Sequence, residues 1–202
     1  QRFEFDCKGE AEIAASLVHG VSVPADVRDR VRDSLDTSFV DFDMSEFDRL
    51  LGVLWLNNAN YVRVSPARRV AQTLRMLQLC ERMDGLYLDV EPMDDGSNET
   101  RVSFAVGIPP HRGYLAQLVE ALNRLDLGLS RAYVLHVATA TQPYGLFALY
   151  VRPRKGGVLE PGSALHTQLE RELFNTQILS ADSPEYREFV TAGLMSGEDA
   201  SL

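Results

Sequence analysis

The sequence predicts an α+β fold in which a ferredoxin-like antiparallel sheet carries helices on one face and has further helices flanking it. Two observations predict this class. The stretch from Thr100 to Arg152 has the order strand, helix, strand, strand, and a helix and a strand lie directly ahead of it. The ferredoxin-like order is βαββαβ, and moving its last helix and strand to the front keeps every contact and changes only the chain break. We therefore expect a circular permutation of that fold.

The central unit is predicted element by element. Arg101–Val106 has the composition of a strand, and Gly107–Gly113 is a turn because its two prolines fit neither a helix nor a sheet interior. A helix follows, in which apolar residues recur at the spacing of one helical face and Gly128 marks the end. These residues are Leu115, Leu118, Val119, Leu122 and Leu125. Arg131–Ala138 and Gly145–Val151 are two further strands joined by a polar turn.

The elements on either side of this unit have clear start and stop signals. Ser65–Met83 is predicted as a helix because an N-cap hydroxyl precedes proline at the first helical position. Gly85–Glu91 alternates apolar and polar residues, as a strand covered on one side should. A Gly/Pro linker, Pro153–Gly162, leads to a helix at Ser163–Gln177, and a last helix is expected from Ser183 onward.

The N-terminal part is predicted to be helical. Glu10–His19 and Pro24–Leu35 have apolar residues at helical spacing. A third helix is expected to begin at a cap formed by Asp43 or Ser45, to carry a wide apolar face and to end at Asn57–Asn60.

The composition argues against several classes of function. A net charge of −9 and an isoelectric point near 4.9 disfavour nucleic acid, and the arginines are scattered among acids, so we expect no nucleic-acid partner. The longest strongly apolar run, Leu50–Leu56, is far shorter than the roughly 20 residues of a membrane helix, so we expect no membrane partner. Cys7 and Cys80 lack metal-ligand spacing and are expected to be reduced thiols of a cytoplasmic protein.

The sequence contains no residue pattern typical of catalysis. No histidine has a second histidine or a cysteine at ligand spacing, and no Gly-rich phosphate-binding turn lies between a strand and a helix. The two lysines, Lys8 and Lys155, lie in predicted loops, where a desolvated catalytic amine is hard to place. We therefore predict no catalytic residue, no metal site and no cofactor in this chain.

The turn before the central helix is the candidate binding site. It connects a strand to a helix N-terminus, where free backbone N–H groups and the helix dipole favour an anion. Arg112 and these amides are predicted to receive a carboxylate or a phosphate of a small effector. The alternative is a solvated turn that binds nothing. The predicted effector-binding residues are Gly107, His111, Arg112, Gly113 and Tyr114.

Three segments resemble parts of one protein family. Asn60–Arg75 is similar to a pattern found ahead of the ACT-like regulatory domain in the large bacterial NAD-specific glutamate dehydrogenases. The stretch from Pro110–Leu115 through Gly128–Val134 resembles the first strand, loop, helix and strand of an ACT-type module. Glu172–Leu179 resembles the segment that leads from that module toward the catalytic part. The order of the three segments carries the resemblance.

The resemblance implies a noncatalytic regulatory or assembly segment of such a dehydrogenase, with NAD bound by the catalytic part of the same polypeptide. It divides the chain into an N-terminal helical segment at 1–60, an ACT-like ferredoxin-like domain at 61–155 and a helical connector toward the catalytic part at 156–202. The implied partners are that catalytic part, further subunits of a homo-oligomer and a small-molecule effector.

Two alternatives stay open. Patterns like Tyr61–Pro66 also precede ACT domains in nitrogen-regulator uridylyltransferases, so the chain could be an effector-sensing module of another nitrogen-metabolism enzyme. The loop Gly107–Gly113 also lacks the Asp or Asn that amino-acid-binding ACT modules usually carry there. The other alternative, from a different class, is a self-contained small enzyme.

The two strands within Arg131–Val151 are apolar at consecutive positions, so both of their faces should be covered. One face is expected to receive the helices of the fold. The second face, with Tyr133 and Leu135, is predicted to pack against the N-terminal helices, against the helix Ser163–Gln177 or against a second subunit.

Overall fold

The computed structural model describes residues 22–82, 86–109, 114–182 and 194. The predicted helix Glu10–His19, the helix expected from Ser183 and the thiol of Cys7 lie outside the described residues.

The chain forms two compact units. The helical unit comprises the described residues up to 82 together with Leu135–Leu146, and the sheet unit comprises the described residues of Gly85–Val134 and Phe147–Leu202. This division cuts the chain at other points than the domain boundaries predicted at residues 60 and 155.

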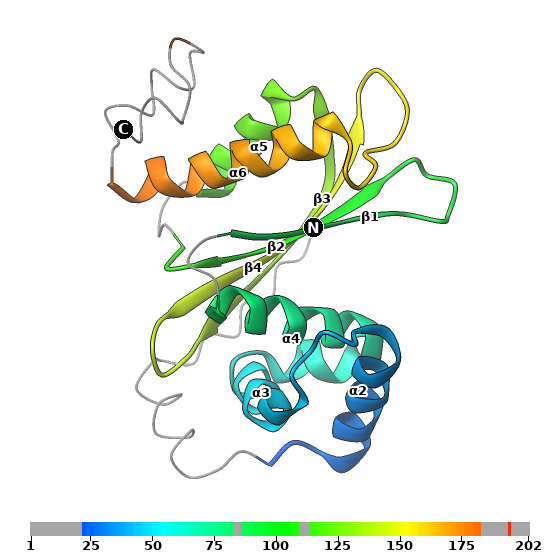
Figure 1. Cartoon of the computed structure of the whole chain (residues 1–202), viewed down its shortest axis with the longest axis vertical. Coiled ribbons are helices and arrows are strands. Elements are labelled where there is room, and N and C mark those ends of the chain that lie inside the picture. Colours follow the sequence, from blue (N-terminus) through cyan, green and yellow to red (C-terminus); the bar gives the residue numbers. More distant parts are fainter. Residues whose placement is uncertain (1–21, 83–85, 110–113, 183–193, 195–202) are drawn as a thin grey trace. The chain divides into compact units, whose positions relative to one another are not determined.

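An antiparallel sheet organises the sheet unit. Its strands are β1 (Leu86–Pro92), β2 (Thr100–Gly107), β3 (Leu127–Ala138) and β4 (Pro143–Pro153), and they lie in the order β1-β2-β4-β3 (Figure 1). This is the ferredoxin-like order with β1 in the place of the last strand. The predicted α+β, ferredoxin-like class is confirmed.

Helices α5 (Tyr114–Arg124) and α6 (Ala164–Asp182) cover one face of this sheet (Figure 1). The chain passes through α5 from β2 to β3, and β4 lies between these two strands, as in a split βαβ unit. Leu118 of α5 and Leu169 of α6 lie in the same buried cluster as Phe104 of β2. The two helices therefore share one core with the sheet.

The helix that lies beside α5 on the sheet is not the one that the sequence predicts. The sequence predicts Ser65–Met83 for this place, whereas the structure has α6 there and assigns α4 (Ala67–Arg82) to the helical unit. The reason is that Leu169 and Leu173 of α6 are fully buried in the core beneath α5. The helix Ser163–Gln177 is one of the three covers that the sequence predicts for the second face of the sheet. Because α6, which takes its place, lies on the same face as α5, it does not cover that second face.

Aromatic packing sets the orientation of α5. Phe104 and Phe147 stack with ring centroids 4.8 Å apart, and Tyr114 meets Phe147 edge-on at 5.5 Å. Tyr114 is only 5% exposed, whereas Leu115, predicted to be in the core, is 45% exposed. Successive helical residues differ by about 100° around the axis, so burial of Tyr114 turns Leu115 outward.

The side chains of β3 switch between the two faces of the sheet in the middle of the strand. Leu129, Ala132 and Val134 all pack against the core cluster, although side chains of a regular strand alternate between faces. Ser130 and Arg131 both lie against Tyr150, because Ser130 Oγ donates to its carbonyl oxygen (3.1 Å) and the guanidinium of Arg131 lies 4.2 Å from its ring centroid. We infer a β-bulge at residues 130–131.

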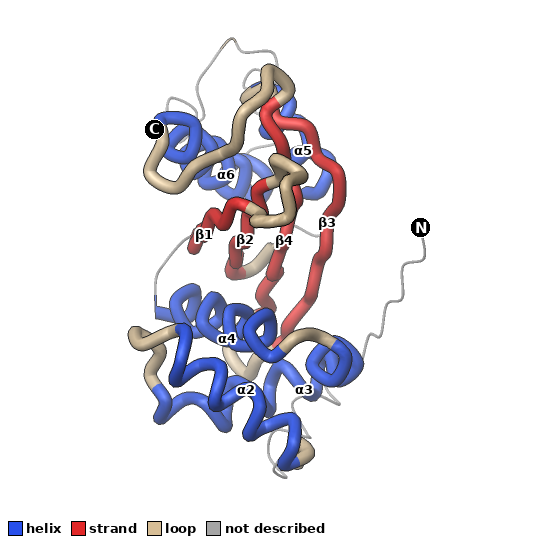
Figure 2. The backbone as a smooth tube through the Cα atoms, turned by 90° about the vertical axis from the view of Figure 1, so that its right-hand side faces the viewer, coloured by secondary structure: helices blue, strands red, loops and turns tan. Residues whose placement is uncertain are grey.

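The helical unit consists of α2 (Ala25–Ser38), a 3₁₀ turn η1 (Met44–Glu46), α3 (Phe47–Val64) and α4, together with the end of the β3–β4 hairpin; Figure 2 shows the helices as blue tubes. The side chain of Asp43 caps η1 by accepting from Ser45 N at 3.1 Å. The sequence predicts this cap for the third helix itself, whereas α3 begins after Glu46, which makes no side-chain cap bond. Apolar residues spaced by four place one stripe of α2 in the core. They are Val27, Val31 and Leu35.

α3 continues beyond its predicted end. The sequence predicts a stop at Asn57–Asn60, and Asn58 within it is non-helical, with φ of −145° and ψ of 50°. The chain then resumes a helix, so that α3 as a whole runs to Val64. Asparagine side chains can bond nearby backbone groups in place of the helical ladder. Here the amide of Asn57 donates to Val53 O, one turn back, at 2.8 Å.

Candidate functional site

The loop between β2 and α5 is the predicted effector site. The structure places two of its five residues: Gly107 ends β2 and Tyr114 begins α5. His111, Arg112 and Gly113 lie outside the described residues.

The described part of this loop has an unusual backbone and an exposed apolar side chain. Ile108 has a φ of +49°, in the left-handed region that a β-branched residue rarely adopts, and its side chain is 63% exposed. Pro109 beside it is buried. Residues held in such conformations are frequent at ligand-binding loops.

Two buried polar groups lie on one side of the first turn of α5. Among the described residues, neither the hydroxyl of Tyr114 nor the amide nitrogen of Gln117 has a hydrogen-bond partner. Both side chains are more than nine-tenths buried, and their spacing of three places them on the same helical face. Burial also raises the pKa of the Tyr114 hydroxyl, because the phenolate would lose its hydration.

These two donors suit a small ligand that carries a hydrogen-bond acceptor. A phenol and an amide each present a donor, so a carboxylate, a carbonyl or a water molecule beside them would satisfy both groups. Gln117 is not among the residues that the sequence predicts. The signal was present, because Tyr114, Gln117 and Leu118 follow the i, i+3, i+4 spacing of the apolar stripe, and an amide in that stripe is unusual.

A second polar cluster joins the β1–β2 connection to β3. Arg131 Nη2 lies 2.6 Å from Glu99 Oε2, and the same guanidinium stacks on the ring of Tyr150. A hydrogen bond with Ser130, and next the charge and hydrogen bond of Arg131, hold the pKa of the Glu99 carboxyl below its ordinary value. The cluster is a satisfied ion pair, and we assign it to stability.

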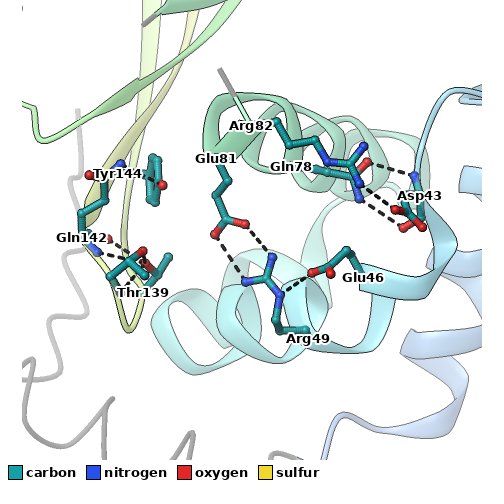
Figure 3. A network of polar contacts seen from close by, with 10 residues as sticks. Asp43, Glu46, Arg49, Gln78, Glu81, Arg82, Thr139, Gln142 and Tyr144 are labelled. Atoms are coloured by element: carbon teal, nitrogen blue, oxygen red, sulfur yellow. Dashed lines mark hydrogen bonds and ion pairs between the residues drawn. The ribbon is translucent and has the colours of Figure 1, made fainter. Parts of the chain in front are cut away.

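The helical unit has its own polar network, shown in Figure 3. Gln78 of α4 is 2% exposed and forms two bonds with the backbone of Asp43, accepting from its N at 2.9 Å and donating to its O at 3.1 Å. Arg82, one turn further, reaches the Asp43 carboxylate at 2.7 Å. These bonds fix the segment before α3 to α4.

The same view shows Arg49 of α3 between two carboxylates, Glu46 and Glu81 (Figure 3). The hydrogen bond to Glu81, with that to Glu46, raises the pKa of Arg49 above its already high ordinary value. In the same figure Gln142 donates to the hydroxyl of Tyr144 at 2.8 Å. An arginine that stays charged between two glutamates links helices and offers no group for proton transfer.

Asparagines of α3 bind the outer edge of β3 at the hairpin. The amide nitrogen of Asn57 donates to Ala138 O (3.0 Å) and its carbonyl oxygen accepts from Ala138 N (2.8 Å). Asn58 donates to His136 O at 2.9 Å. These side chains occupy positions that a neighbouring strand would otherwise take.

Metal ligation and membrane insertion find no support in the part of the chain that the structure describes. Within it, no group of three or more His, Cys, Asp or Glu side chains could hold a metal ion. His166 accepts a hydrogen bond from Gly162 N at its Nδ1 (2.8 Å), at the start of α6. No described helix is both long and apolar enough to cross a bilayer.

The comparisons with known proteins add no relative. No protein-family model matches the chain, and no curated protein matches it. What the fold defines is an α+β protein with a ferredoxin-like antiparallel sheet.

Proposed function

We propose that this chain is a noncatalytic regulatory or assembly segment of a cytoplasmic NAD-dependent glutamate dehydrogenase, which oxidatively deaminates glutamate to 2-oxoglutarate. The observation that carries the proposal is the order of the three resembling segments, Asn60–Arg75, Pro110–Val134 and Glu172–Leu179, along a chain with a ferredoxin-like sheet. The strand–helix–strand order of β2, α5 and β3 supports it, because the second segment resembles that part of an ACT-type module.

In this proposal the chain acts by contacting other parts of the enzyme and carries out no reaction itself. NAD binds to the catalytic part of the same polypeptide, and this segment touches that part and further subunits of a homo-oligomer.

An activity assay with two proteins tests the proposal. The 202-residue chain alone should not oxidise glutamate with NAD, whereas the polypeptide encoded by its whole reading frame should. Deleting this segment from the longer protein should change its subunit assembly or its response to effectors. The shortened protein should still be able to oxidise glutamate with NAD. Glutamate oxidation by the 202 residues alone would overturn the proposal in favour of a self-contained enzyme.

A second candidate is an effector-sensing module of another nitrogen-metabolism enzyme, such as a uridylyltransferase. The observation that favours it is the pair of buried, unpartnered groups of Tyr114 and Gln117, in the part of the loop and helix that the structure describes. Calorimetry with amino acids and nucleotides tests this candidate. Heat that disappears in Gln117→Leu, with the fold intact, would support sensing, and no heat from any of these ligands would leave the contact role alone.

A further inference from the structure

The outer edge of β3 carries backbone groups that no other strand of the sheet pairs, because β3 is last in the order β1-β2-β4-β3. Two observations tell which residues face outward. Thr139 N donates to Gln142 O across the hairpin at 3.2 Å, so odd-numbered residues near the hairpin point to β4. Both backbone atoms of Ala138 instead bond Asn57. Even-numbered residues between the bulge and the hairpin therefore direct their N–H and C=O groups outward.

Both ends of this edge are already closed. Toward the hairpin, Asn57 and Asn58 take the outward groups of Ala138 and the carbonyl of His136. Toward the start of β3, the side chains change faces at residues 130–131, as at a β-bulge, which is a common way to end pairing at an edge. Within the described residues, the outward groups left open between these two ends are those of Ala132 and Val134 and the N–H of His136.

We propose that Ala132–Val134 pairs in antiparallel fashion with the same stretch of a second copy of this chain, with Tyr133 on the two-fold axis. The open stretch has two outward-facing residues, Ala132 and Val134, placed symmetrically about Tyr133. A two-fold axis through Tyr133 brings each Ala132 opposite the partner's Val134, so the outward N–H and C=O groups of both residues find complements.

The side chain at the axis fits this arrangement. Tyr133 is 54% exposed, although it contacts Tyr150 edge-on with ring centroids 5.9 Å apart. In antiparallel pairing, directly opposed residues that exchange no backbone bonds have Cα atoms about 4.5 Å apart, where aromatic pairs contribute to stability. Pairing would bury the exposed part of Tyr133 against the partner's Tyr133.

Charge favours a second copy at this stretch and not elsewhere on the edge. The chain has a net charge of −9, so two copies repel unless they meet at a neutral surface. Residues 132–135 carry no charge, and the adjacent Arg131 is neutralised by Glu99 at 2.6 Å. Two bonding residues a side make a small contact, so the dimer should dissociate on dilution. The inference rests on the assembly part of the proposed function.

Substitutions that place charged side chains at Tyr133, on the two-fold axis, test the proposed pairing. Tyr133→Glu and Tyr133→Arg each place like charges opposite one another and remove the aromatic pair, so each should raise the dimer dissociation constant about tenfold. An equimolar mixture of the two variants should regain the wild-type dissociation constant as a heterodimer. Sedimentation velocity over a concentration series of the 202-residue chain measures all three. Variants that leave the dissociation constant unchanged, or a mixture that fails to restore it, would overturn the pairing.

A backbone variant gives an independent readout. Val134→Pro removes one outward N–H without removing a bond to β4, so the dimer loses two hydrogen bonds and its dissociation constant should rise about 30-fold. Val134→Ala, which keeps the N–H, is the matched control and should dimerise like the wild type.

The outcomes separate the inference from the proposed function. A wild-type dimer that is insensitive to these substitutions sinks the β3 pairing and leaves the assembly role standing. A wild-type chain that stays monomeric at every concentration overturns both the pairing and self-assembly by this segment. Neither outcome depends on the glutamate oxidation assay, which tests the parent enzyme.

Discussion

The side-chain amide of Asn57 forms a two-point hydrogen bond with the backbone of Ala138, 81 residues away in the chain. Asn57 is 9% exposed and also donates to Val53 O, so its amide is fully engaged at the kink of α3. One polar side chain thus bonds both backbone groups of an edge-strand residue and a carbonyl of its own helix.

Asn57→Leu should lower the free energy of unfolding by about 1–3 kcal/mol, because leucine leaves the N–H and C=O of Ala138 without their partner. Chemical denaturation followed by circular dichroism measures the change. Asn58→Ala is the comparison, since it removes one exposed bond to His136 O and should cost less. Equal losses for the two variants would contradict the special role of Asn57.

Tyr114→Phe should leave the protein as stable or make it about 1 kcal/mol more stable. The reason is that the buried hydroxyl has no partner among the described residues, and burying an unsatisfied hydroxyl costs free energy. The edge-on contact with Phe147 is kept in the variant. Thermal unfolding of both proteins checks this, and a clear loss of stability would mean that the hydroxyl has a partner.

Leu173→Ala should cost about 2–5 kcal/mol, because it opens a cavity in the core that α6 shares with α5 and the sheet. Its neighbour Phe174 is 43% exposed, so Phe174→Ala should cost no more than about 1 kcal/mol. Denaturant titration of the two variants compares them. Equal costs would contradict the docking of α6 as the companion of α5.

Acid should weaken the fold through Glu99. Its pKa is lowered from the ordinary 4.5 by Ser130 first and Arg131 second, so its contribution to stability is present above the unfolded-state pKa. That contribution is lost as the pH falls through the lowered folded-state pKa. Stability measured from pH 7 downward should therefore decline less steeply in Glu99→Gln than in the wild type below about pH 4.5. Glu160→Gln, at an exposed position, is the control and should follow the wild type.

Part of the candidate site could be read from the sequence. The loop between β2 and α5 was expected from its prolines, and Tyr114 was expected within the site, because turn chemistry is local. Gln117 was missed, since an amide on a helix is exposed in most proteins and its burial depends on the sheet beneath it.

The sequence by itself determined the α+β class, the order of strands and helices from β1 to α6 and the start of each long helix, because periodicity and capping act within a few residues. Only the tertiary structure decided that α6 rather than α4 shares the core with α5, since both helices have an apolar stripe. It also decided that Asn57, beside the break at Asn58, is followed by further helix up to Val64. The physical reason is that its partner, Ala138, lies far along the chain, and a local pattern carries no information about a contact at that separation.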